Sequence, residues 1–292
     1  MIRSYSIVLF CNTMNDWINN SAQLFIQNKI VPCGLGLAYV SFGPCKNFGP
    51  RTCFFGYTIL MGTFSYGFYL LVAAFGYRKY VLFRKPPKIK TTWTICGCCL
   101  IPTIIQITTA LFSLDNEKEV REMVQRQEPH SDYSKQAVTG HLNIFSSLIL
   151  LKIVHIVCMV VPMYLTILVI RYQTLQKIKT SFTMSSTTKR LHGQFIKALT
   201  IQSFLPLFGA FAVLCYIPQQ LGWIDLPWAN HMILATASPI PIFNPIATVY
   251  CVGTYRRAAR KILRFKKQHF HSSEGKPIGT VSYHSVGESL TI

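Results

Sequence analysis

The sequence predicts an all-α protein built as a multi-pass bundle of membrane-spanning helices. Half of its 292 residues are hydrophobic, only 13% are charged, and the mean hydropathy is +0.32. Soluble domains carry about 25% charged residues, so this chain has too few charges to cover a water-facing surface. The excess of 29 Lys and Arg over 10 Asp and Glu would also suit nucleic-acid binding. These charges lie between long apolar runs, however, so a lipid bilayer is the expected partner and nucleic acid is not.

Six segments are long enough to cross a bilayer as helices, for which about 20 mostly apolar residues are needed. Five of them are clearly apolar: residues 54–77, 92–112, 144–170, 196–218 and 232–252. The sixth, residues 5–27, has four asparagines and Asp16 in its interior. Because these polar groups would be costly against lipid, we expect the other helices to enclose this segment.

Positive charge alternates between the connections of these six segments. One set of connections holds 20 Lys and Arg residues, whereas the other holds seven. The rich set comprises residues 1–4, 78–91, 171–195 and 253–292. The poor set comprises residues 28–53, 113–143 and 219–231. The positive-inside rule places the rich set in the cytoplasm, so both termini are expected inside.

Residues 1–270 are expected to form one transmembrane domain with two further features of its own. The second outside connection, residues 113–143, contains a polar run at residues 115–127, which we expect to be a solvated helix or a lid. After the last span, residues 254–268 combine an apolar stripe with a basic face, which is typical of an amphipathic helix on the inner leaflet. The tail at 271–292 is rich in Ser, Gly and His and is expected to be disordered.

The ten cysteines show no metal-ligand spacing, so no metal or cofactor is expected. Cys33, Cys45 and Cys53 lie in or beside the first outside connection, where oxidation is allowed. Cys45 and Cys53 enclose a short turn-rich stretch that can close as a disulfide, although the sequence leaves all three pairings open. The chain also has no nucleophile elbow, phosphate-binding loop or pair of carboxylates, which argues against an enzyme.

Three ionisable side chains, Asp16, Lys152 and His155, lie well inside the ends of predicted spans. Asp16 is near mid-span, where such a group is a functional candidate by default, with Asn244 or Thr248 as its expected partner. A purely structural polar contact explains Asp16 equally well. Lys152 and His155 share a helix face near the outer leaflet. Either Lys152 snorkels to the headgroups, or this pair lines an outward-facing cavity that binds a ligand.

Prolines are placed where helices could bend. The last span has three prolines within seven residues, and the third, Pro245, directly follows Asn244. Each proline removes a backbone donor, so this helix is expected to kink and to act as a hinge. Pro162 and Pro206 give the fourth and fifth spans the same option. The alternative is that prolines are simply commoner in membrane helices than in soluble ones.

Basic side chains mark the cytoplasmic side. Arg78 directly follows the second span, and the positive-inside rule alone would explain a positive charge at this position. The functional alternative is that Arg78 contacts a cytoplasmic partner or latches neighbouring helices together. Lys189, Arg190 and Lys197 lie on or beside the connection 171–195, which is the expected protein-facing surface.

Several segments of the chain form a recognisable set: Gly43–Lys46, Phe48–Pro50 with Cys53, Phe75–Arg78, Met184–His192 with Ala198–Gln202 and Leu205-Pro206, and Pro239–Pro245 with Tyr255-Arg256. Together they resemble the nematode serpentine chemoreceptors of the Str-type superfamily, class delta in particular. The resemblance covers about residues 5–264. It implies a G-protein-coupled receptor in the plasma membrane, in the cilium of a sensory neuron. A small odorant or metabolite would be its ligand and a heterotrimeric G protein its partner.

The resemblance also implies roles for individual residues. Arg78 matches the arginine at the cytoplasmic end of the family's third helix, Pro206 matches the hinge of the sixth, and Asn244-Pro245 match the Asn-Pro motif of rhodopsin-like receptors. The acidic residue usual before that arginine is replaced by Tyr77. Only six spans are predicted where the family has seven, because Met1 falls just before the match to the family's second helix.

Two alternatives to a working receptor remain open at this point. Kinked helices and intramembrane polar residues also serve a membrane transporter or channel. A truncated receptor that does not signal is the other alternative, in view of the missing first span.

Overall fold

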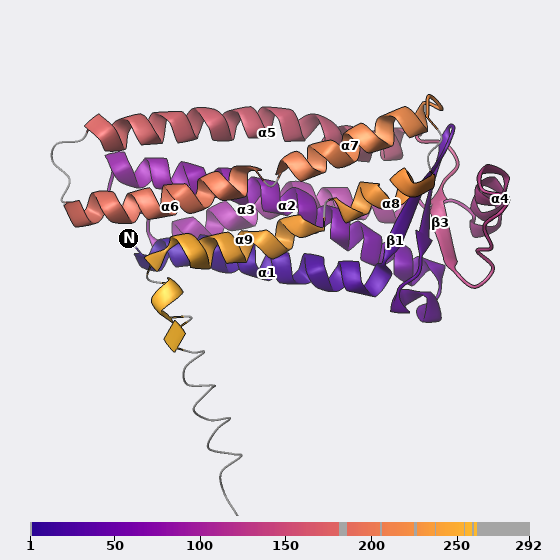
Figure 1. The fold of residues 1–292 in the computed structure, drawn as a ribbon, viewed down its shortest axis with the longest axis horizontal. Helices are drawn as coiled ribbons and strands as arrows, with labels where there is room; N and C mark the ends of the chain where they lie inside the picture. Colours follow the sequence, from indigo (N-terminus) through magenta and orange to yellow (C-terminus); the bar gives the residue numbers. More distant parts are fainter. Residues whose placement is uncertain are drawn as a thin grey trace, which may run out of the picture.

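A computed structural model of the chain describes residues 2–180, 186–204, 206–224, 227–236, 238–253, 255–258 and 260–261. It is a bundle of long helices with a small sheet at one end (Figure 1). The bundle consists of α1 (Ile2–Ile26), α2 (Pro50–Phe83), α3 (Ile89–Leu111), α5 (Ser147–Thr180), α6 (Ser186–Phe204), α7 (Pro206–Gln220), α8 (Pro227–Ala235) and α9 (Pro239–Cys251). The predicted fold class, a multi-pass helical bundle, is confirmed.

Five segments of the described residues are long and apolar enough to cross a membrane, and each overlaps one of the five apolar spans of the sequence. They are Pro50–Phe83, Ile89–Leu111, Ser147–Ile178, Ile196–Gln220 and Asn230–Cys251. Their outer faces carry large exposed apolar side chains, as Leu151, Val161 and Leu165 do on α5. Such a face would be unfavourable in water, whereas lipid accepts it.

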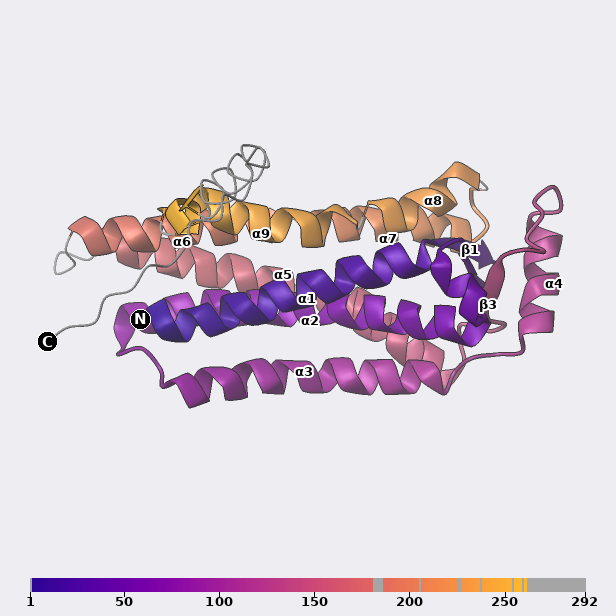
Figure 2. The same cartoon turned by 90° about the horizontal axis from the view of Figure 1, so that it is seen from below.

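The polar sixth segment forms α1, which lies beside α2 and α9 in the bundle (Figure 2). Asn12, Asn15 and Asp16 on its inner side are buried, as expected. Its opposite side is exposed, however, with Trp17 and Leu24 both more than 60% accessible. The prediction that other helices enclose α1 is therefore correct only for its polar face.

The two predicted sets of connections lie at opposite ends of the bundle. The start of α1, the turn between α2 and α3, the end of α5 and the end of α9 share one end, which we call the basic end (Figures 1 and 2). The opposite end has the structure that we call the cap. The cap comprises β1 (Asn28–Cys33), β2 (Gly36–Ser41), the 3-10 helix η1 (Pro44–Phe48), α4 (Glu117–Gln127) and β3 (Ala137–His141).

The cap contains a three-stranded antiparallel sheet in the order β1-β2-β3, which the sequence analysis did not predict. Cys33 pairs with Gly36, so the hairpin loop is only two residues long. Its first residue, Gly34, has a φ of +60°, a conformation that glycine adopts without a side-chain clash. The expected polar helix is present as α4, and the Asn116 side chain accepts a hydrogen bond from the Lys118 backbone N–H at its start.

A disulfide joins Cys45 of η1 to Cys53 in the first turn of α2, with the two Cα atoms 5.1 Å apart. This is one of the three pairings that the sequence left open, and Cys33 is a free thiol. The bridge ties the strand β2, which directly precedes η1, to the helix on which the sheet packs.

A helix break occurs in one of the spans that were expected to bend at their prolines. In the fifth span, α6 is described to Phe204 and α7 from Pro206, and residue 205 lies outside the described residues, so a bend at Pro206 stays a prediction. The last span is divided between α8 and α9, which begins at Pro239. Proline suits the first turn of a helix because its missing N–H would have no partner there. Pro162 and Pro245 instead lie inside continuous helices. Movement at any of these positions stays a prediction.

Only part of the predicted amphipathic helix is described. Residues 255–258 and 260–261 are helical. The remainder of this helix, residues 262–268, and the predicted disordered tail at 271–292 lie outside the described residues.

A buried ion pair fastens the cap to α8. Lys29 Nζ of β1 lies 2.7 Å from Glu128 Oε2, and the Asn230 amide of α8 donates to Glu128 Oε1 at 3.1 Å. The Tyr133 hydroxyl also donates to Glu128. Burial raises the pKa of Glu128, but the hydrogen bonds from Lys29 and Tyr133 and the charge of Lys29 outweigh it and leave the pKa below its ordinary value. The pKa of Lys29 is raised, since the same contacts with Glu128 and Tyr133 outweigh the lowering effect of burial.

We expect Glu128→Gln to lower the free energy of unfolding at neutral pH by about 3 kcal/mol, because it leaves the Lys29 ammonium buried without an opposite charge. A carboxyl with a lowered pKa stabilises the fold above its unfolded pKa of about 4.3, and this contribution is lost as pH falls through the lower folded pKa. The difference from the wild type should therefore shrink in acid. Thermal unfolding of the purified protein at pH 7 and about pH 3 would measure it, with the exposed Glu119→Gln as the matched control. Equal unfolding temperatures at pH 7 would contradict this prediction.

Candidate functional site

A cavity of about 780 Å³ lies beneath the cap, between α2, α5, α7 and α8. Most of its lining is apolar, from residues such as Leu37, Met61 and Ile233. Lys152 is the charged residue among its lining side chains, and we call the space the Lys152 cavity. Its apolar lining, with few polar groups, is typical of a small-molecule site.

Lys152 lies near the start of α5, directly under the sheet, and is only 4% exposed. Its Nζ is 5.6 to 5.8 Å from the ring centroids of Tyr39, Phe54 and Tyr57, close enough for cation–π attraction. Tyr39 comes from β2 and the other two rings come from α2. The interpretation that Lys152 snorkels to the lipid headgroups is therefore wrong, because this side chain is enclosed by protein.

The hydrogen-bond partner of Lys152 is His141 of β3, whose Nε2 lies 3.3 Å from Lys152 Nζ. His141 Nδ1 is 2.8 Å from the Ser113 carbonyl oxygen, which can only accept, so Nδ1 carries the ring proton. Burial, and then the charge of Lys152, lower the pKa of His141 to about 3. His141 is thus a neutral acceptor, and the Lys152 ammonium donates to its lone pair.

His155 faces a different space, although it is only three residues from Lys152. Its Nε2 lies 3.1 Å from the Tyr69 hydroxyl of α2. It lines a smaller cavity of about 240 Å³ together with Phe68 and Met159. The expected shared cavity is therefore not found among the described residues. Three residues along the helix place His155 about 4.5 Å farther from the cap. Phe64 and Ile156 line both cavities.

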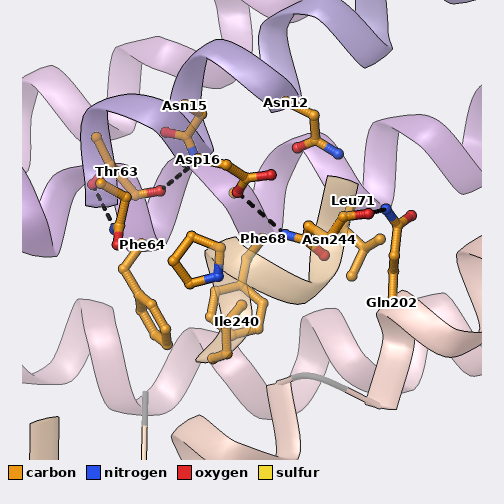
Figure 3. Close-up of a pocket in the computed structure, with 13 residues that line it drawn as sticks. Asn12, Asn15, Asp16, Thr63, Phe64, Phe68, Leu71, Gln202, Ile240 and Asn244 are labelled. Carbon is orange, nitrogen blue, oxygen red and sulfur yellow. Dashed lines mark hydrogen bonds between the residues drawn. The ribbon is translucent and has the colours of Figure 1, made fainter. Parts of the chain in front are cut away.

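A polar cavity of about 450 Å³ lies deeper in the bundle, between α1, α2, α6 and α9 (Figure 3). The Asn244 amide of α9 donates to Asp16 Oδ1 at 3.3 Å, so the structure pairs Asp16 with one of its two expected partners. On the opposite side, Asn15 donates to the Thr63 carbonyl oxygen of α2 at 2.9 Å, and Asn19 donates to the Thr63 hydroxyl at 2.8 Å. The polar side of α1 is thus tied to α2 and α9.

Gln202 of α6 completes this network, and the sequence analysis did not identify it. Its amide donates to the Asn244 carbonyl oxygen at 2.9 Å and to the Thr248 hydroxyl at 3.0 Å. Thr248, the alternative partner proposed for Asp16, is therefore held by α6. Gln202 therefore connects α6 to α9.

Arg78 lies at the basic end of α2 and is only 1% exposed. Its guanidinium carbon is 3.4 Å from the ring centroid of Tyr5 on α1. Of the two functional interpretations of Arg78, this buried position favours a contact that holds neighbouring helices together. It does not favour a side chain that is directly exposed to a partner. Arg190 and Lys197 of α6 are exposed at the same end of the bundle. The side chain of Lys189 lies outside the described part of the chain.

A helical bundle with apolar spans, a cavity under a cap and basic connections at the opposite end defines a multi-pass membrane protein. The family model described as serpentine type 7TM GPCR chemoreceptor Srd matches residues 1–261, and the chain belongs to this family. The resemblance to class delta is thereby confirmed. The family is one of receptors and not of enzymes.

Curated relatives from Caenorhabditis elegans agree with this assignment. Serpentine receptor class delta-19 is 28% identical over 90% of this chain and 79% of its own length. Serpentine receptor class delta-18 is 27% identical over 98% of this chain and 86% of its own length. Serpentine receptor class delta-3 is 25% identical over 88% of this chain and 77% of its own length.

We expect Asp16 and Asn244 to be energetically coupled across the polar cavity. Removing either partner leaves the other buried without its hydrogen bond, so Asp16→Ala and Asn244→Ala should each destabilise the fold by about 1–3 kcal/mol. The double variant should lose less than the sum of the two, with an interaction energy of at least about 0.5 kcal/mol.

Thermal unfolding of the four proteins gives this double-mutant cycle. A second cycle that combines Asp16→Ala with Thr94→Ala, at an exposed position on α3, is the control and should be additive. Additive effects for Asp16 and Asn244 would show that their contact contributes nothing.

Proposed function

We propose that the chain is a chemosensory receptor that binds a small environmental chemical in the Lys152 cavity and signals to a heterotrimeric G protein at the basic end. Membership of the Srd family supports the general activity. The observation that carries the proposal for the ligand is the apolar cavity under the cap, which contains one buried cation.

In this proposal the cap faces the outside, and the basic end and C-terminus face the cytoplasm. The partition of 20 against seven positive residues supports this orientation through the positive-inside rule. The Cys45–Cys53 disulfide in the cap also fits an oxidising environment on that side. We further propose the plasma membrane of a sensory cilium as the location, on family likeness.

Ala212 of α7 offers a test of the ligand site, because it lines the Lys152 cavity and is buried. We expect Ala212→Leu to fill part of the cavity and to raise the half-maximal ligand concentration at least about tenfold. Overpacking of this kind costs about 1–3 kcal/mol of stability, so surface expression must be measured in the same cells. Ala210→Leu, one position outside the lining, is the matched control.

The measurement is a second-messenger response to a panel of volatile and water-soluble chemicals. A wild-type chain that reaches the surface and responds to no chemical would count against the chemosensory role. Ala212→Leu that responds like the wild type to every active chemical would count against the Lys152 cavity as the site.

The positions of Pro206 and Pro239 suggest how ligand binding reaches the basic end. α7 and α8 line the Lys152 cavity, whereas their continuations α6 and α9 meet at Gln202 and Asn244 and end near Arg78. A ligand that shifts α7 or α8 would change the angle at Pro206 or Pro239. We propose that this movement separates α6 and α9 from Arg78 and opens a surface bordered by the exposed Arg190 and Lys197, with Lys189 beside them in the sequence.

We expect Arg78→Ala to reach the cell surface normally but to lose G-protein coupling. The truncation removes both the stacking on Tyr5 and a cation for an acidic partner surface, and loss of one desolvated charge contact costs about 2–5 kcal/mol. Surface biotinylation and a second-messenger assay in the same cells measure the two properties. Arg84→Ala is the control, because Arg84 belongs to the same connection but is exposed. If Arg78→Ala signals normally, Arg78 serves only as a positive-inside anchor.

A further inference from the structure

The Lys152 ammonium has no acidic partner in the part of the chain that the structure describes. The ion pairs there are Lys29–Glu128, Arg121–Glu117 and Arg126–Glu122, and none includes Lys152. Its hydrogen-bond partner, His141, is neutral. A charge enclosed by protein normally requires a counter-charge with good geometry, and ring faces with one neutral nitrogen replace it only in part.

Lys29 in the cap is a second buried lysine, and the fold does provide it with an acidic partner. It is as enclosed as Lys152, at 5% against 4% exposure, but it has Glu128 and Tyr133 within 3 Å. The arrangement around Lys29 is closed and stabilises the cap. The arrangement around Lys152 lacks the carboxylate and borders an open cavity instead.

The rest of the cavity limits what could supply the missing charge. Two further donors are available, the Tyr39 and Tyr216 hydroxyls, which are buried without a hydrogen-bond partner among the described residues. The other lining side chains are mostly aliphatic or aromatic. Lys152 supplies one positive charge, which matches the single charge of a carboxylate with an apolar body. A phosphate would bring up to two negative charges to this one cation.

We propose that the Lys152 cavity is a site for small monocarboxylates with an alkyl or aryl body. The carboxylate lies on Lys152 Nζ, with the Tyr39 and Tyr216 hydroxyls as further donors, and the body packs against the apolar lining below the cap. This inference rests on the proposed function, since it names the ligand class of the proposed receptor site.

Direct binding to the purified full-length protein tests the inference without any signalling partner. The probes are hexanoate and phenylacetate, with hexanol and phenylethanol as neutral counterparts of similar shape. Binding is followed by the shift of the thermal unfolding temperature with probe concentration. We expect the wild type to bind each carboxylate at least about tenfold more tightly than its alcohol, because only the carboxylate completes the buried charge.

Lys152→Met removes the charge while keeping a side chain of similar length and should fold, because replacing a buried charge by an apolar group is often stabilising. We expect it to lose the preference for carboxylates and to bind the alcohols at least as tightly as the wild type does. Lys46→Met is the matched control, the same substitution at an exposed lysine of the cap. It should keep the wild-type preference.

The inference is overturned if the wild type binds the alcohols as tightly as the carboxylates, if it binds neither, or if Lys152→Met keeps the preference. The wild-type comparison stands even if Lys152→Met does not fold. Failure of the proposed function is a separate result: carboxylate-selective binding with no second-messenger response would support the site and contradict the receptor activity. A response to neutral chemicals without carboxylate binding would do the reverse.

Discussion

The packing of Tyr39 against the start of α2 is the contact on which the functional end of the molecule depends. The Tyr39 ring centroid lies 4.0 Å from that of Tyr57 and 6.2 Å from that of Phe54. Tyr39 is on β2, the central strand of the sheet, so this contact seats the whole cap on the bundle. The same three rings surround the Lys152 ammonium. A cap that did not seat here would leave both the cavity without a roof and its cation without aromatic neighbours.

The two buried lysines at this end differ in how far the protein compensates their charge. In a low-dielectric interior, an ion is stable only where its surroundings replace the water that it has lost. Lys29 obtains that replacement from Glu128, and the resulting cluster fixes α4 and α8 to the sheet. For Lys152, aromatic rings and the neutral His141 replace the lost water only in part. An incompletely satisfied cation beside an apolar cavity favours binding of an anion with an apolar body.

The interior of the bundle connects this end to the basic end through polar contacts rather than apolar packing alone. Asp16, Asn244 and Gln202 join three helices at mid-bundle, close to Pro206 and Pro239 of the last two spans. Hydrogen bonds have directional requirements, so any movement of α6 relative to α9 would have to preserve or break the bonds of Gln202 to Asn244 and Thr248.

The sequence by itself determined the apolar spans and the two ends of the bundle, because lipid imposes length and hydropathy on every spanning segment. It left Asn244 and Thr248 open as partners of Asp16, and the tertiary structure decided for Asn244. The sheet was missed although apolar residues flank the Gly34 turn, since strands of five or six residues give too weak a period. Only the tertiary structure decided that Lys152 lies enclosed with His141 and that Arg78 lies against Tyr5. A sequence specifies which groups are charged, whereas burial depends on neighbours that are distant in the chain.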